Sequence, residues 1–176
     1  MLLTRMYALR KFSLITICIL FSSVLLASEN AEDWPRWRGA NFDGVSSPAS
    51  HPFSHPFELR IRWKRKLGTG YSGVVVSKGQ AVTMFSDGKT DYLIALSADE
   101  GDLLWHLPLG ETFPPRDGSS GGPVSTPAID RNVVYALGPR GQLVAVDLSD
   151  GKLLWKRDVV AELGASTPHW GFTTSP

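Results

Sequence analysis

The stretch GDLLWHL at residues 101–107 returns as GKLLWKR at residues 151–157. Extended back to residues 93–105 and 143–155, the two copies share six identities in thirteen gapless positions and end on the same tryptophan. A fixed period of about 20 to 50 residues is typical of repeat architectures such as solenoids and propellers. The repeat therefore decides the fold class before any local propensity does.

Three residue types recur in the repeated unit, and each has a physical role. The glycine stands where a tight turn between two strands needs a positive φ. The alanine keeps one position small so that a neighbouring sheet can approach closely, and the tryptophan supplies a large apolar area for that contact. These structural repeat residues are Gly101 and Gly151, Ala95 and Ala145, and Trp105 and Trp155.

The sequence around each copy indicates four short strands, which are rich in β-branched and aromatic residues and joined by tight turns. One blade is expected at about 73–110, a second at about 123–160, and the start of the next at 164–176. A four-stranded sheet with two apolar faces cannot bury both alone, so it must stack on copies of itself. The pattern predicts an all-β fold, a β-propeller of four-stranded antiparallel blades with only about two blades present.

The segment Leu59–Leu67, LRIRWKRKL, begins by alternating apolar and basic residues, as a strand with one buried face does. We expect it to be the outer strand of the last blade, supplied by the N-terminus to close the ring, with Trp63 in the docking position. Its partner strands are missing, and two unclosed blades would expose sheet edges. The sequence is therefore expected to be the N-terminal part of a longer protein.

The N-terminus has the pattern of a secretory signal peptide at residues 1–28. Basic residues precede an uncharged apolar run, and cleavage is expected near Ala27 or Ser28. The run is shorter than a membrane-spanning helix needs, so contact with a membrane is expected only through this segment if it stays uncleaved. Cys18, the only cysteine, lies inside it, so the mature chain would have no disulfide.

Residues 29–58 are rich in Pro, Gly and Ser and form an irregular lead-in, with Trp34 and Trp37 as expected anchors onto an apolar surface. Other motifs in the chain are weak. Ser120 lies in DGSSGGPV, which resembles a nucleophile motif, but the prolines exclude the following helix and no histidine stands in a protease setting. The prolines beside His51 and His55 exclude the helix that would make them metal ligands.

The hairpins YLIALSADEGDLLWHLPL and GQLVAVDLSDGKLLWKRDV resemble the repeat of the PQQ-like (pyrroloquinoline quinone type) β-propeller proteins, and DWPRWRGANFDGVS resembles the start of many exported bacterial members. The resemblance covers about residues 33–176. It implies that Trp105, Trp155 and Trp63 dock between adjacent blades. Ser97 and Asp102 depart from the repeat at positions that we interpret as surface positions.

The resemblance leaves two functions open. The first is a binding or scaffold module without a catalytic set, like the lipoprotein of the outer-membrane barrel assembly machinery, which has the same repeat; the missing lipobox cysteine argues against direct equivalence. The second is the N-terminal part of a quinoprotein dehydrogenase that oxidises alcohols or sugars with PQQ and calcium. No cofactor is evident from the residues, and the vicinal cysteines of such dehydrogenases are absent after the signal peptide.

The expected partner is a protein or small-molecule ligand on the propeller loops. His169 and Trp170 are weak candidates for that site, because they lie in the loop that opens the next blade. The formal net charge of +1 gives no reason to expect nucleic acid, even with the basic RIRWKRK segment. The expected location is the periplasm or the secreted fraction.

Overall fold

The computed structural model describes residues 33–46, 58 and 60–176. The predicted signal peptide lies outside these residues, as do Cys18, His51 and His55. In the part of the chain that the structure describes, no helix is long and apolar enough to cross a membrane.

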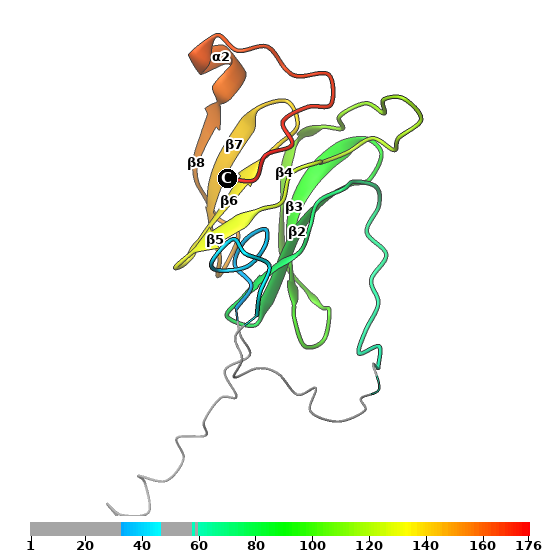
Figure 1. Cartoon of the computed structure of the whole chain (residues 1–176), viewed down its shortest axis with the longest axis vertical. Coiled ribbons are helices and arrows are strands. Elements are labelled where there is room, and N and C mark those ends of the chain that lie inside the picture. Colours follow the sequence, from blue (N-terminus) through cyan, green and yellow to red (C-terminus); the bar gives the residue numbers. More distant parts are fainter. Residues whose placement is uncertain (1–32, 47–57, 59) are drawn as a thin grey trace, which may run out of the picture. The chain divides into compact units, whose positions relative to one another are not determined.

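Two four-stranded antiparallel sheets, each with its strands in sequence order, make up the described β structure (Figure 1). The fold is therefore all-β with two propeller blades, which confirms the predicted class. The first blade contains β1 (Val75–Ser77), β2 (Gln80–Ser86), β3 (Thr90–Ser97) and β4 (Leu103–Glu111). The second contains β5 (Ala128–Asp130), β6 (Val133–Leu137), β7 (Gln142–Asp147) and β8 (Leu153–Asp158).

Both faces of the first blade are apolar. Alternate side chains of a strand point to opposite faces, and Leu93 and Ala95 of β3 belong to a core cluster that also draws on residues of the second sheet. Tyr92 of the same strand instead stacks on Phe85, with 5.4 Å between the ring centroids. A blade with two apolar faces needs a neighbour on each side, which is the property that the repeat predicted.

The two blades are joined by Trp105, whose indole lies on the turn between β7 and β8. Its Nε1 donates to the carbonyl oxygen of Leu148 at 2.8 Å. A Cβ atom on Gly151 would stand 2.6 Å from Cδ2 of this indole, and Gly151 has a φ of 71°. The glycine is therefore required twice, by the turn and by the close approach of the ring.

Trp63 makes the same contact one blade earlier. Its Nε1 donates to the carbonyl oxygen of Ala98 at 3.0 Å, and a Cβ on Gly101 would lie 2.6 Å from its Cδ2. Ala98 and Gly101 correspond to Leu148 and Gly151 in the repeat. The contact of Trp63 with the first blade is thus the geometric copy of the contact between the two blades.

Trp155, the third tryptophan of the series, is 41% exposed on β8 and lies 6.1 Å from the ring of Tyr135. The two alanines of the repeat are fully buried and stand directly opposite tryptophans of their own blades, in the pairs Ala95–Trp105 and Ala145–Trp155. Their small size therefore makes room for an indole on the adjacent strand.

Residues 60–67 form no hydrogen-bonded strand, whereas a strand was expected over 59–67. A strand requires a ladder partner, and none of the described segments pairs with these residues. Two of the basic side chains instead bind the turn of the first blade: Arg62 pairs with Asp99 at 2.7 Å, and Arg65 donates to the carbonyl oxygen of Gly101 at 2.9 Å. Leu59 lies outside the described residues.

A second link between the blades is made by side-chain hydroxyl groups near the starts of β1 and β5, the first strands of the two blades. The N–H of Gly73 donates to Oγ1 of Thr126 at 3.0 Å, and the N–H of Thr126 donates to Oγ of Ser175 at 3.1 Å. The same backbone-to-hydroxyl bond therefore occurs twice, and its second copy reaches the segment where the next blade was expected to start. That segment, 164–176, contains no strand.

The described part of the lead-in, residues 33–46, is a folded loop that ties the two inner strands together. Trp34 and Val76 exchange two backbone hydrogen bonds of 2.8 and 2.9 Å, and the carbonyl oxygen of Pro35 accepts from the N–H of Ile129 at 2.7 Å. The loop therefore contacts β1 and β5 at once.

Only one of the two lead-in tryptophans packs as an anchor. The ring of Trp34 lies against Gly39, whose Cβ position would be 2.9 Å away from it. Trp37 is 57% exposed and lies under the guanidinium of Arg38, 5.5 Å from the ring centroid. The expectation that Trp37 is an apolar anchor is wrong, because Trp37 lies within the turn that the hydrogen bond from the Gly39 N–H to the Arg36 carbonyl oxygen closes, and its ring stays exposed there.

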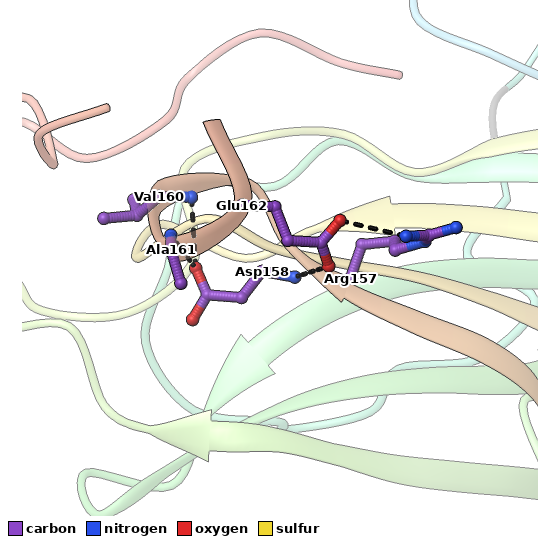
Figure 2. A network of polar contacts seen from close by, with 5 residues as sticks. All are labelled: Arg157, Asp158, Val160, Ala161 and Glu162. Atoms are coloured by element: carbon purple, nitrogen blue, oxygen red, sulfur yellow. Dashed lines mark hydrogen bonds and ion pairs between the residues drawn. The ribbon is translucent and has the colours of Figure 1, made fainter. Parts of the chain in front are cut away.

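A short helix, α2 (Val159–Leu163), follows β8 and was not expected from the sequence. Figure 2 shows its cap: the Asp158 carboxylate accepts from the N–H groups of Val160 and Ala161, each at 3.0 Å. Glu162 accepts from the backbone of Asp158 and from Arg157. These bonds satisfy N–H groups that a helix N-terminus leaves free.

The contact between indole and glycine predicts different costs for two glycine substitutions. Gly79 has a φ of 73° and nothing within 4 Å of a Cβ position, so Gly79→Ala measures the cost of the left-handed backbone alone, about 1 kcal/mol. Gly151→Ala should cost about 1–3 kcal/mol more, because its methyl group displaces Trp105. Urea unfolding of both variants measures the difference, and equal losses would contradict the docking role.

Candidate functional site

A cavity of about 370 Å³, here called the loop cavity, lies where three irregular segments meet. The segment before β1 contributes Tyr71, the connection from β4 to β5 contributes Phe113 and Arg116, and the segment after α2 contributes Trp170. The walls are completed by Pro114, Ser119, Ser120, Gly122, Val124 and Thr173. Its size falls within the range of ligand sites, about 300–1,000 Å³.

Hydrogen bonds within the β4–β5 connection hold in place the part of the cavity wall that this connection forms. The N–H of Ser119 donates to the carbonyl oxygen of Arg116 at 2.7 Å, and the N–H of Gly122 donates to that of Phe113 at 3.0 Å. The N–H of Ser120 donates to the hydroxyl of Tyr71 at 2.9 Å, which fixes this loop to the segment before β1. Two of the three segments are therefore tied together.

The third segment is tied by His169, one of the two ligand candidates from the sequence. Its Nε2 lies 3.1 Å from Oδ2 of Asp117, on the β4–β5 connection. The ring of Trp170, the other candidate, stands edge-on to His169 at 5.4 Å between centroids and remains 46% exposed on the cavity wall. The structure thus places Trp170 in the cavity wall. His169 does not line the cavity but holds this segment against the β4–β5 connection.

Asp91 is a buried carboxyl group bonded to the backbone of Phe113, a residue of the cavity wall. Asp91 is 3% exposed, and its Oδ2 accepts a hydrogen bond from the N–H of Phe113 at 3.2 Å. Burial raises the pKa of the Asp91 carboxyl, an effect that the hydrogen bond from Phe113 and the charge of Arg140 oppose. The backbone of Phe113 is therefore held by a carboxyl group in an unfavourable environment.

Two arginines approach the ring of Phe113, each with its guanidinium carbon 5.8 Å from the centroid. Arg140 also reaches Glu111 at 4.0 Å. Arg116 lines the cavity and is exposed, and no ion pair links it to a carboxylate among the described residues. The cavity therefore combines aromatic walls with one available positive charge.

The arrangement does not form a nucleophilic site. Ser120 lines the cavity, yet no described histidine is hydrogen-bonded to its hydroxyl, and His106 instead stands edge-on to Tyr92. In the described ranges no three residues of the types His, Cys, Asp and Glu come together as a possible metal site. What the cavity offers chemically is apolar contact, hydroxyl groups and a guanidinium.

Tyr71, Phe113 and Arg116 were not singled out from the sequence. They lie in irregular segments, where no periodicity indicates which side chains converge. One signal in the sequence could have indicated these residues. Residues 110–123 are dense in Gly and Pro around one aromatic and one basic residue, which is typical of a structured loop.

Comparison with known proteins places this two-bladed fold in a family. The family model described as outer membrane protein assembly factor BamB matches residues 59–170. The chain belongs to this family of PQQ-like β-propeller repeat proteins.

Individual relatives match over part of their length. Outer membrane protein assembly factor BamB of Kangiella koreensis is 33% identical over 93 residues, which is 51% of this chain and 22% of the relative. The Yersinia pestis protein of the same description is 29% identical over 106 residues, 56% of this chain and 26% of the relative. The crystal structure of BamB from Moraxella catarrhalis has a TM-score of 0.42 at 19% identity, covering 55% of this chain and 26% of that one. The chain therefore matches about a quarter of the length of each.

The buried Asp91 predicts a pH-dependent effect of substitution. Since its pKa is raised in the folded chain, ionised Asp91 lowers stability near neutral pH, and this penalty disappears as the pH falls through the raised pKa. Asp91→Asn keeps an oxygen acceptor for Phe113 and removes the charge. The variant should be more stable than the parent near neutral pH, and the gain should shrink towards about pH 4.

Urea unfolding at both pH values tests this expectation. Asp102→Asn is the matched control, because the Asp102 side chain is exposed, and it should show no comparable change with pH. A gain for Asp91→Asn that is the same at both pH values would contradict the assignment of the penalty to the buried charge.

Proposed function

We propose that this protein is an exported, non-catalytic β-propeller module that binds a protein partner through its loops during the assembly of outer membrane proteins. The observation that carries the proposal is the loop cavity, which presents aromatic walls and Arg116 on a member of the assembly factor family. Exposed aromatic residues with an arginine are typical of the centres of protein interfaces.

The preformed walls of the site suit a protein partner. The cavity is framed by segments that belong to different blades and are tied by hydrogen bonds, so a partner would meet a preformed surface. We propose the periplasm as its location, since the sequence begins with the pattern of a secretory signal peptide. The outer membrane machinery named for the relatives would be reached from that compartment.

The quinoprotein alternative requires a set of calcium and quinone ligands. The described residues that line the loop cavity include Arg116 and several hydroxyls but no carboxylate, so they do not fit a bound calcium ion.

Photo-crosslinking in cells that produce the full-length protein tests the proposed function. A benzophenone amino acid at Trp170, on the cavity wall, should give a discrete crosslink to a component of outer membrane protein assembly. The same probe at Arg131, whose side chain is 89% exposed and does not line the loop cavity, is the matched control and should not give that product. Mass spectrometry of the crosslinked band identifies the partner.

A correctly exported protein that gives no protein crosslink at any wall position would contradict the proposal. Calcium- and PQQ-dependent oxidation of an alcohol by the purified protein would favour the dehydrogenase instead.

A further inference from the structure

We propose that the loop cavity receives a large apolar side chain from an extended segment of the partner protein, and that Arg116 pairs with a carboxylate next to that side chain. The inference rests on the proposed protein-binding function and specifies the chemistry of the segment that is bound.

The apolar side chain is indicated by the cavity walls. Tyr71 is 56% exposed and Trp170 is 46% exposed, and together with Phe113 they surround about 370 Å³ of space. Large aromatic surfaces left open to water mark contact sites, because their burial is favourable and a rigid ring loses little entropy on binding. An aromatic or large aliphatic group therefore fits the cavity best.

The carboxylate is indicated by Arg116. Its guanidinium lies over Phe113, which orients it at the cavity, and the described residues supply it with no ion-pair partner. The nearest acidic neighbour in sequence, Asp117, is engaged by His169. A guanidinium has donor pairs that match a carboxylate, so the complementary group is an acidic side chain or a peptide carboxyl terminus.

The extended shape is indicated by a second cavity of about 320 Å³, lined by Trp37 and by residues 173–175. Thr173 lines both cavities, so both lie against this segment. A single small molecule in the loop cavity would leave the exposed ring of Trp37 unused. A peptide strand has side chains at regular spacing and can fill both cavities at once.

Binding of a defined peptide to the full-length protein tests the inference. The probe is a short fluorescein-labelled peptide with two phenylalanines and one aspartate in a glycine and serine background, measured by fluorescence anisotropy. We expect Arg116→Gln to weaken binding about tenfold, which is the loss of one charge-assisted pair. Trp170→Ala should weaken it by a similar factor. Arg116→Lys should also weaken it, though less than Arg116→Gln, because lysine keeps the charge but lacks the paired donors of the guanidinium.

A double-mutant cycle separates the charge pair from structural damage. A second peptide carries asparagine in place of aspartate, and Arg116→Gln should change its affinity by less than about twofold, since no carboxylate remains to pair. Arg131→Gln is the matched control, because Arg131 is exposed and its ion pair among the described residues is with its neighbour Asp130. It should leave both affinities unchanged.

Three results would overturn the inference. They are no binding of the aspartate peptide, an equal effect of Arg116→Gln on both peptides, and binding of free phenylpropionate as tight as that of the peptide, which would indicate a small-molecule site. A crosslink at Trp170 without peptide binding would leave the proposed function standing and reject this inference. Peptide binding with the charge cycle but no crosslink would support the inference and reject the role in assembly.

Discussion

The fold depends on an indole ring that lies on a glycine turn. Trp105 covers Gly151 and donates to Leu148, and Trp63 covers Gly101 and donates to Ala98, so one interaction is repeated at the same place in successive blades. It is specific because it couples three requirements: a turn with positive φ, a surface without a Cβ and a carbonyl oxygen within reach of Nε1. Stacking of whole blades follows from a contact between two residues.

The docking contact also explains why the faces of the blades can consist of simple aliphatic residues. The core between the two sheets consists mainly of Val, Leu and Ala, which give apolar area but little direction. The indole fixes the register of one blade on the next, and the hydroxyl bonds of Thr126 do the same at the inner strands. Buried area supplies most of the free energy, and these two polar links select one arrangement.

Sequence analysis predicted the parts of the fold that the repeat constrains. It gave the two four-stranded blades, because spacing, turn glycines and strand composition all act over a few residues. It could not give α2, since a five-residue helix has no periodicity, although Asp158 and Gly164 stand at its two ends as cap residues. It misjudged Trp37, because the exposure of a ring on the turn from Arg36 to Gly39 depends on packing in three dimensions.

The candidate site was harder to predict for the same physical reason. Its residues come from the connections between blades, which the repeat leaves free, so Phe113 and Arg116 have no equivalents that a periodic pattern could reveal. The docking residues fix the ends of these connections, and short bonds such as that of His169 to Asp117 then close them into a wall. A regular scaffold thus holds an irregular surface rigid, and this division lets loop chemistry vary while the blades are preserved.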